Sequence, residues 1–77
     1  MAFHISIEKV SERAEEAVYA FHDTAYPAQS GELRLDNLSG VIQMTKETRF
    51  DFFQRAAAKV RRSFNAGSLP EKLEWAL

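Results

Sequence analysis

Residues 32–44 contain the pattern that most limits the folds open to this chain. Polar and apolar residues alternate over 32–36, a turn-like NLSG segment follows, and an apolar run resumes at 41–44. Alternation with a period of two is typical of a half-buried β-strand. Gly40 can take the left-handed backbone conformation that short hairpin loops often require. We therefore predict a β-hairpin here, which implies an antiparallel sheet.

A second alternating segment, residues 3–8, predicts another strand. Residues 17–23 are ambiguous. As part of a helix that begins at an N-cap on Ser11, they would place their apolar side chains on one face. As a strand, they would place Tyr19 and Phe21 on the same side, and their β-branched and aromatic residues favour that structure. The alanine and glutamate residues just before them favour a helix, so the residues alone leave both open, with a slight preference for helix.

The clearest helix is expected over about residues 49–65. Thr48 suits the N-cap position, and Gly67 suits the residue that follows a helix. The apolar side chains that recur there at helical spacing are Phe53, Ala57, Val60 and Phe64. The tail, residues 68–77, fits either a short helical turn or an extended segment. Its apolar residues indicate that it packs against the rest of the chain, because few termini carry so much apolar surface unless they are tied down.

Four patterns together resemble a group of small bacterial proteins with no known activity. They are VYxF at 18–21, GxLRLDxxSG at 31–40, RAAxKxRR at 55–62 and LPExxxWA at 69–76. The resemblance implies that residues 17–23 form a strand. The fold it implies is α+β with the order β-β-β-β-α, an antiparallel meander of three or four strands covered by one helix, and β-α-β-β-α is the alternative. It implies no activity.

The chain of 77 residues contains no cysteine. Disulfides, thiolate metal sites and a cysteine nucleophile are therefore excluded, and the aromatic residues must supply much of the core. We expect one small domain over residues 1–77. No apolar run is long enough to span a membrane, and the N-terminal residues lack the basic region of a signal peptide. These features favour a soluble cytoplasmic protein.

No residue pattern predicts catalysis, and we expect neither an enzyme nor a cofactor. The two histidines, His4 and His22, have no third residue spaced to complete a metal site. The carboxylates of Glu12, Glu15 and Glu16 lie in a charged stretch with nothing that marks a pocket. The glycine-rich, nucleophile and metal motifs of common enzyme families are absent from the sequence.

One basic cluster stands out from this background. Arg55, Lys59 and Arg62 follow the spacing i, i+4, i+7, so they share a face of the expected helix. Arg34 and Arg49 are expected to extend this patch. A basic stripe can follow the phosphates of a nucleic acid by charge alone, although a formal net charge of -1 is unusual for such a protein.

We expect a protein-interaction or adaptor module that binds a protein partner or a second copy of itself as a homodimer, and nucleic-acid binding by the basic helix face is the alternative. A small open sheet has exposed edge strands, which can pair with another chain. Phe50, Phe52 and Phe53 cannot all face one core, because positions two apart lie on different faces of a helix. At least one of them, or Tyr26, is therefore expected to cover a loop, pack under the C-terminal tail or meet a partner.

Overall fold

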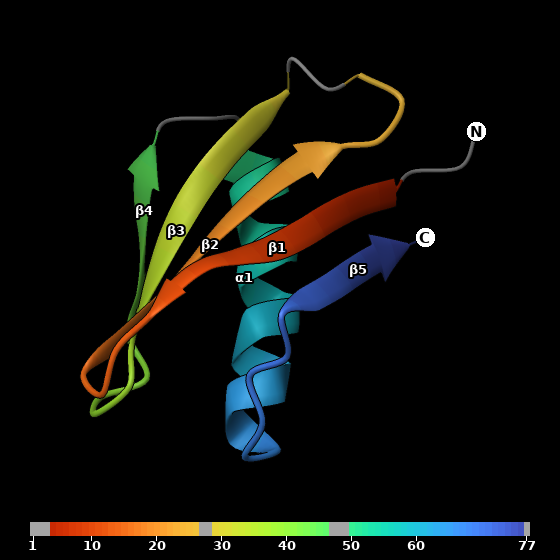
Figure 1. The fold of residues 1–77 in the computed structure, drawn as a ribbon. Coiled ribbons are helices and arrows are strands. Elements are labelled where there is room, and N and C mark those ends of the chain that lie inside the picture. Colours follow the sequence, from red (N-terminus) through yellow and green to blue (C-terminus); the bar gives the residue numbers. More distant parts are fainter. Residues whose placement is uncertain (1–3, 27–28, 47–49, 77) are drawn as a thin grey trace.

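The computed structural model describes residues 4–26, 29–46 and 50–76, and the side chains of 50–52 are not described. Figure 1 shows an antiparallel sheet with one helix across one face. The sheet order is β4-β3-β2-β1-β5, and every neighbouring pair is antiparallel. The elements along the chain are β1 His4–Glu12, β2 Glu16–Asp23, β3 Ser30–Asp36, β4 Ile42–Lys46, α1 Phe50–Asn65 and β5 Lys72–Ala76.

The expected α+β fold with one helix is confirmed, but the expected strand count of three or four is wrong. The sheet has five strands because the C-terminal tail forms β5, which pairs with β1. Leu73 and Trp75 alternate with exposed residues in this strand and pack against the core, so the tail is extended and not helical. The element order is therefore β-β-β-β-α-β.

Residues 17–23 form a strand, so the alternative order β-α-β-β-α is wrong. Ala17, Tyr19 and Phe21 are all buried and alternate with half-buried residues. A helix would have turned Tyr19 and Phe21 to different faces, because positions two apart do not share one. The strand β2 lies between β1 and β3 in the sheet, and it places both aromatic side chains in the same core.

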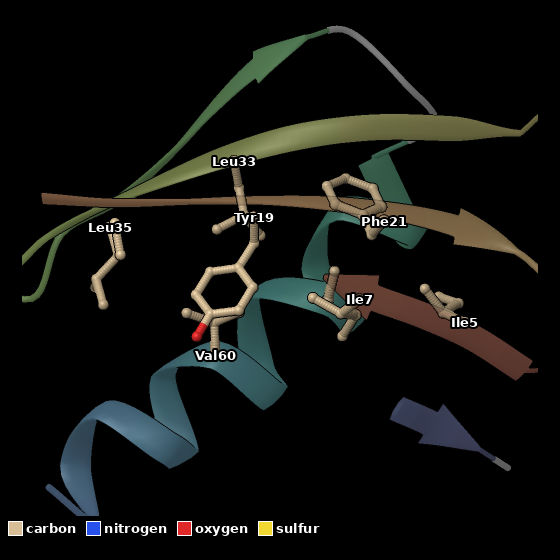
Figure 2. Close-up of a cluster of buried hydrophobic side chains, with 9 residues drawn as sticks. Ile5, Ile7, Tyr19, Phe21, Leu33, Leu35 and Val60 are labelled. Carbon is tan, nitrogen blue, oxygen red and sulfur yellow. The ribbon is translucent and has the colours of Figure 1, made fainter. Parts of the chain in front are cut away.

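The core lies between the sheet and α1. Figure 2 shows side chains of β1, β2 and β3 that point toward the helix, with the Tyr19 ring close to Val60. Burying such an apolar side chain stabilises a fold by roughly 1.5–3 kcal/mol. The buried residues are Ile5, Ile7, Ala17, Tyr19, Phe21, Leu33, Leu35, Ala56 and Val60. Among the described residues, no helix has the length and apolar character needed to cross a bilayer.

The helix α1 ends as its sequence predicts. Gly67 has a φ of 84°, which is the left-handed conformation that commonly follows a helix. At the other end α1 begins at Phe50. The expected N-cap, Thr48, lies outside the described residues.

The turn between β3 and β4 is held by Asp36. One carboxylate oxygen of Asp36 accepts hydrogen bonds from the N–H groups of Leu38 and Ser39, at 2.8 and 3.1 Å. These bonds lower the pKa of Asp36 because they favour the charged carboxylate. Gly40 has a φ of 77°, as the hairpin prediction requires. A side chain of Asn37 donates to the carbonyl oxygen of Arg13 at 3.1 Å and so ties this turn to the β1–β2 turn.

Candidate functional site

The three basic residues expected to share a helix face lie together on α1, and one of them, Arg55, reaches β5. Val60 points into the core, and each residue of a helix turns by about 100° from the last. Lys59 therefore points about 100° from Val60, to one side of the helix, and Arg55 and Arg62 point about 140° and about 160° from Val60, mostly away from the sheet. The guanidinium carbon of Arg55 is 5.0 Å from the centroid of the Trp75 ring, which identifies this side as that of β5. We call Arg55, Lys59 and Arg62 the basic flank.

Arg34 does not join the basic flank, contrary to expectation. It lies in β3 between Leu33 and Leu35, which are both buried under α1. Because side chains alternate along a strand, Arg34 points to the opposite, open face of the sheet. There its guanidinium donates a 2.6 Å hydrogen bond to the side-chain oxygen of Gln43 on β4. Arg49, the other expected extension of the patch, lies outside the described residues.

The basic flank borders an edge of the sheet. Within the described residues β5 pairs only with β1, as Figure 1 shows, and the five pairs from His4 with Ala76 to Glu8 with Lys72 run without a register shift. An edge strand with regular backbone geometry can hydrogen-bond to a further strand. Among the described residues, the outer edge of β5 therefore has no strand paired with it.

The hydrogen-bonding pattern between β1 and β5 shows which backbone groups of β5 point outward. The N–H of Lys9 donates to the carbonyl oxygen of Glu71 at 2.7 Å, just before β5 begins. In an antiparallel pair, hydrogen-bonded pairs alternate with pairs that are not hydrogen-bonded. The backbone groups of Leu73 and Trp75 therefore face β1. Those of the alternate residues, Lys72, Glu74 and Ala76, face outward.

The opposite edge, β4, is less regular. Its register against β3 shifts between Glu32 and Leu33, which leaves Thr45 as an extra residue between the paired Met44 and Lys46. An extra residue of this kind bends the strand and interrupts pairing, a common protection of edge strands. β5 is therefore the better candidate for binding another chain.

The two histidines do not form a shared site. The imidazole Nδ1 of His4 lies 3.1 Å from the Thr24 hydroxyl, and its Nε2 lies 3.4 Å from a carboxylate oxygen of Glu74 on β5. His22 lies two positions away, where it pairs with Ser6. Among the residues that the structure describes, no group of three or more side chains could hold a metal ion. His4 thus lies beside Thr24 and Glu74 on the open face of the sheet.

The acidic residues before β2 also have structural contacts. Glu12 accepts a 2.6 Å hydrogen bond from the Lys9 ammonium group.

Burial, with a smaller contribution from the Glu12 carboxylate, raises the pKa of Tyr19 to about 12. The Tyr19 hydroxyl donates a 2.6 Å hydrogen bond to the carbonyl oxygen of Pro70. Sequence reasoning missed this contact, since nothing in the local pattern of either segment points to the other.

Of the aromatic residues expected to meet a partner, only some can be placed. Tyr26 lies in the loop after β2 and is 59% exposed, which fits the expectation that it stays outside the core. Phe53 packs against the core, and the side chains of Phe50 and Phe52 lie outside the described residues. Comparisons of the chain with protein-family models, curated proteins and solved structures give no match. The candidate site is therefore the β5 edge and the basic flank beside it.

Proposed function

We propose that this protein is a non-enzymatic interaction module that binds an extended segment of a protein partner along β5. The observation that supports it is the row of outward backbone groups at Lys72, Glu74 and Ala76, on a strand with no register shift. In strand addition, main-chain hydrogen bonds supply affinity, and the side chains around the edge select the sequence.

A second copy of this chain fits the β5 edge poorly. Two β5 strands paired antiparallel about a two-fold axis would form one continuous sheet with both helices on the same face. The basic flank of each copy would then face the other across the interface. Like charges at close range disfavour such an arrangement. A partner of different charge avoids this repulsion, so we favour a different protein over a homodimer.

The nucleic-acid alternative has less support. It would use the exposed side of α1, yet Arg34 lies on the far face of the sheet. Arg61 points about 160° away from Lys59 around the helix. Nucleic-acid-binding domains usually combine many basic side chains on one surface, whereas three share this flank. Nucleic-acid binding is therefore the competing function, and a titration with single-stranded RNA distinguishes it from strand addition.

The test of strand addition uses short synthetic peptides of alternating glutamate and valine, or glutamine and valine, with blocked ends. The protein is titrated with each, and amide hydrogen exchange is measured by NMR. We expect slower exchange at the outward amides of Lys72, Glu74 and Ala76, with little change at Leu73 and Trp75. The fluorescence of Trp75, the only tryptophan, gives the dissociation constant.

A matched pair of variants separates backbone pairing from side-chain contact. Glu74→Pro removes an outward N–H donor from β5, and Glu74→Ala removes the same side chain but keeps the donor. We expect the proline variant to bind at least tenfold more weakly than the alanine variant. Equal binding by the two variants, or no protection of the outward amides with either peptide, would rule out strand addition along β5.

A further inference from the structure

We infer that the segment bound along β5 is acidic, with carboxylates at alternate positions on the side that faces α1; this rests on the proposed strand addition. The partner is therefore a protein with an extended segment in which acidic residues recur at every second position. The juxtaposition that points to it is Arg55 of the basic flank over Trp75 of β5, a strand whose outer edge pairs with no described strand.

An added strand would place every second side chain beside the basic flank. A neighbouring strand lies about 4.8 Å away, and its side chains alternate between the two faces of the sheet. The side chains on the α1 face would extend the row formed by Leu73 and Trp75. Because Arg55 already reaches over the Trp75 ring, the positive charge lies above this row.

The flank has positive charge with no described counter-ion for two of its members. Lys59 is half-buried and Arg62 is exposed. The ion pairs between described residues are Lys9 with Glu12 and His4 with Glu74, so neither Lys59 nor Arg62 pairs with a described carboxylate. A long basic side chain can pack its stem on the protein and keep its charged end in water. A carboxylate delivered beside Lys59 or Arg62 therefore meets a positive charge that no described carboxylate neutralises.

Arg55 contributes a charge whose position is restricted. Its guanidinium lies over the Trp75 ring, a geometry in which the cation is attracted to the aromatic face. The same contact links the charge to β5, so it stays beside the edge where the segment would bind.

The open face of the sheet gives no comparable preference. Beside the β5 edge it presents Lys72 and Glu74, of opposite charge, and the Glu74 carboxylate lies 3.4 Å from the imidazole Nε2 of His4. A segment bound along β5 would thus meet the basic flank on its α1 side and mixed charge on the other. The acidic requirement is therefore predicted to apply to alternate positions and not to the whole segment.

The experiment compares dissociation constants for the glutamate–valine, glutamine–valine and lysine–valine peptides, with Trp75 fluorescence as the readout. We expect the glutamate peptide to bind at least tenfold more tightly than the glutamine peptide, and the lysine peptide to bind most weakly. The variant with both Lys59→Gln and Arg62→Gln should lose most of that preference. Arg34→Gln removes the same kind of charge from the opposite face and should retain it.

The outcomes separate this inference from the proposed function. Equal affinity for the glutamate and glutamine peptides, with the outward amides of β5 still protected, overturns the acidic preference and keeps strand addition. Loss of protection with every peptide overturns both. A short single-stranded RNA is titrated in parallel at about 50 mM salt. The acidic-peptide inference is wrong if three results occur together: the RNA binds, the Lys59 and Arg62 changes weaken RNA binding, and the glutamate peptide does not bind. The basic flank would then be a nucleic-acid surface.

Discussion

The hydroxyl of Tyr19 donates a 2.6 Å hydrogen bond to the carbonyl oxygen of Pro70, 51 residues further along the chain. Tyr19 lies in β2, in the middle of the sheet, and Pro70 lies in the loop that leads into β5. The contact therefore joins the core to the segment that sets the start of the proposed binding edge. The Lys9 N–H, which donates to the Glu71 carbonyl oxygen at 2.7 Å, holds the same loop from β1.

Replacing Tyr19 with phenylalanine is expected to lower the free energy of unfolding by about 1 kcal/mol, because the Pro70 carbonyl then loses its buried donor. The free energy is measured by urea denaturation. Tyr26→Phe is the matched control. Tyr26 is 59% exposed, so this change should stay within about 0.5 kcal/mol of the parent protein. A loss of equal size in the two variants would show that the Pro70 contact does not stabilise the fold.

The same tyrosine predicts how stability changes at alkaline pH. Burial, followed by the nearby Glu12 carboxylate, raises the pKa of Tyr19 from 10.0 to about 12. Between these values the unfolded chain releases the Tyr19 proton while the folded chain retains it. The unfolded state then binds fewer protons, so stability falls as pH rises through this window and is fully retained below it. Urea midpoints measured across the window should fall more steeply for the parent than for Tyr19→Phe.

Much of the fold follows from local pattern, whereas the pairing of distant segments does not. Alternation over residues 32–44 predicts the β3–β4 hairpin, and the apolar stripe predicts α1. Residues 17–23 fit both a helix and a strand, and only burial between β1 and β3 decides between them. The tail pairs with a strand at the other end of the chain, which no local pattern of residues 68–77 reveals.

The candidate site, like the fold, is predicted only where a local pattern determines it. Helical spacing places Arg55, Lys59 and Arg62 on one face, and the structure brings Arg55 over the Trp75 ring of β5. The expectation that Arg34 extends the basic flank is wrong. Side chains alternate along a strand, and Leu33 and Leu35 are buried under α1, so Arg34 points to the opposite face of the sheet. The edge at β5 could not be predicted, since it exists only once the tail has become a strand.

Two glycines with left-handed backbone allow a matched test of a close contact. Gly40 has a φ of 77°, and a Cβ atom there would lie 3.1 Å from the Phe64 ring. Gly67 has a φ of 84° and open space around that position. An alanine at either site takes on the backbone penalty of about 1–2 kcal/mol, and Gly40→Ala should cost more because the Phe64 ring must shift.

The thermal and urea midpoints of Gly40→Ala and Gly67→Ala measure this difference. A background change, Phe64→Leu, makes room at the first site only. The two alanine penalties should become more alike in that background, because neighbouring residues couple in such cycles and distant ones do not. An unchanged gap between them would mean that the Phe64 contact is not the source of the extra cost.

Ile7 determines how well β5 is held against the sheet. It is fully buried on β1, where it pairs with Phe21 of β2 on one side and Leu73 of β5 on the other. Ile7→Val removes one methylene and should lower the free energy of unfolding by about 0.5–1.5 kcal/mol. Val10, 59% exposed at the irregular step between β1 and β2, is the control, and Val10→Ala should stay within about 0.5 kcal/mol of the parent protein.

If the smaller side chain of Ile7→Val loosens β5, amide exchange at Leu73 and Trp75 should quicken more than at Leu33 and Leu35. Equal acceleration throughout the sheet would show instead that β5 unfolds only with the whole domain.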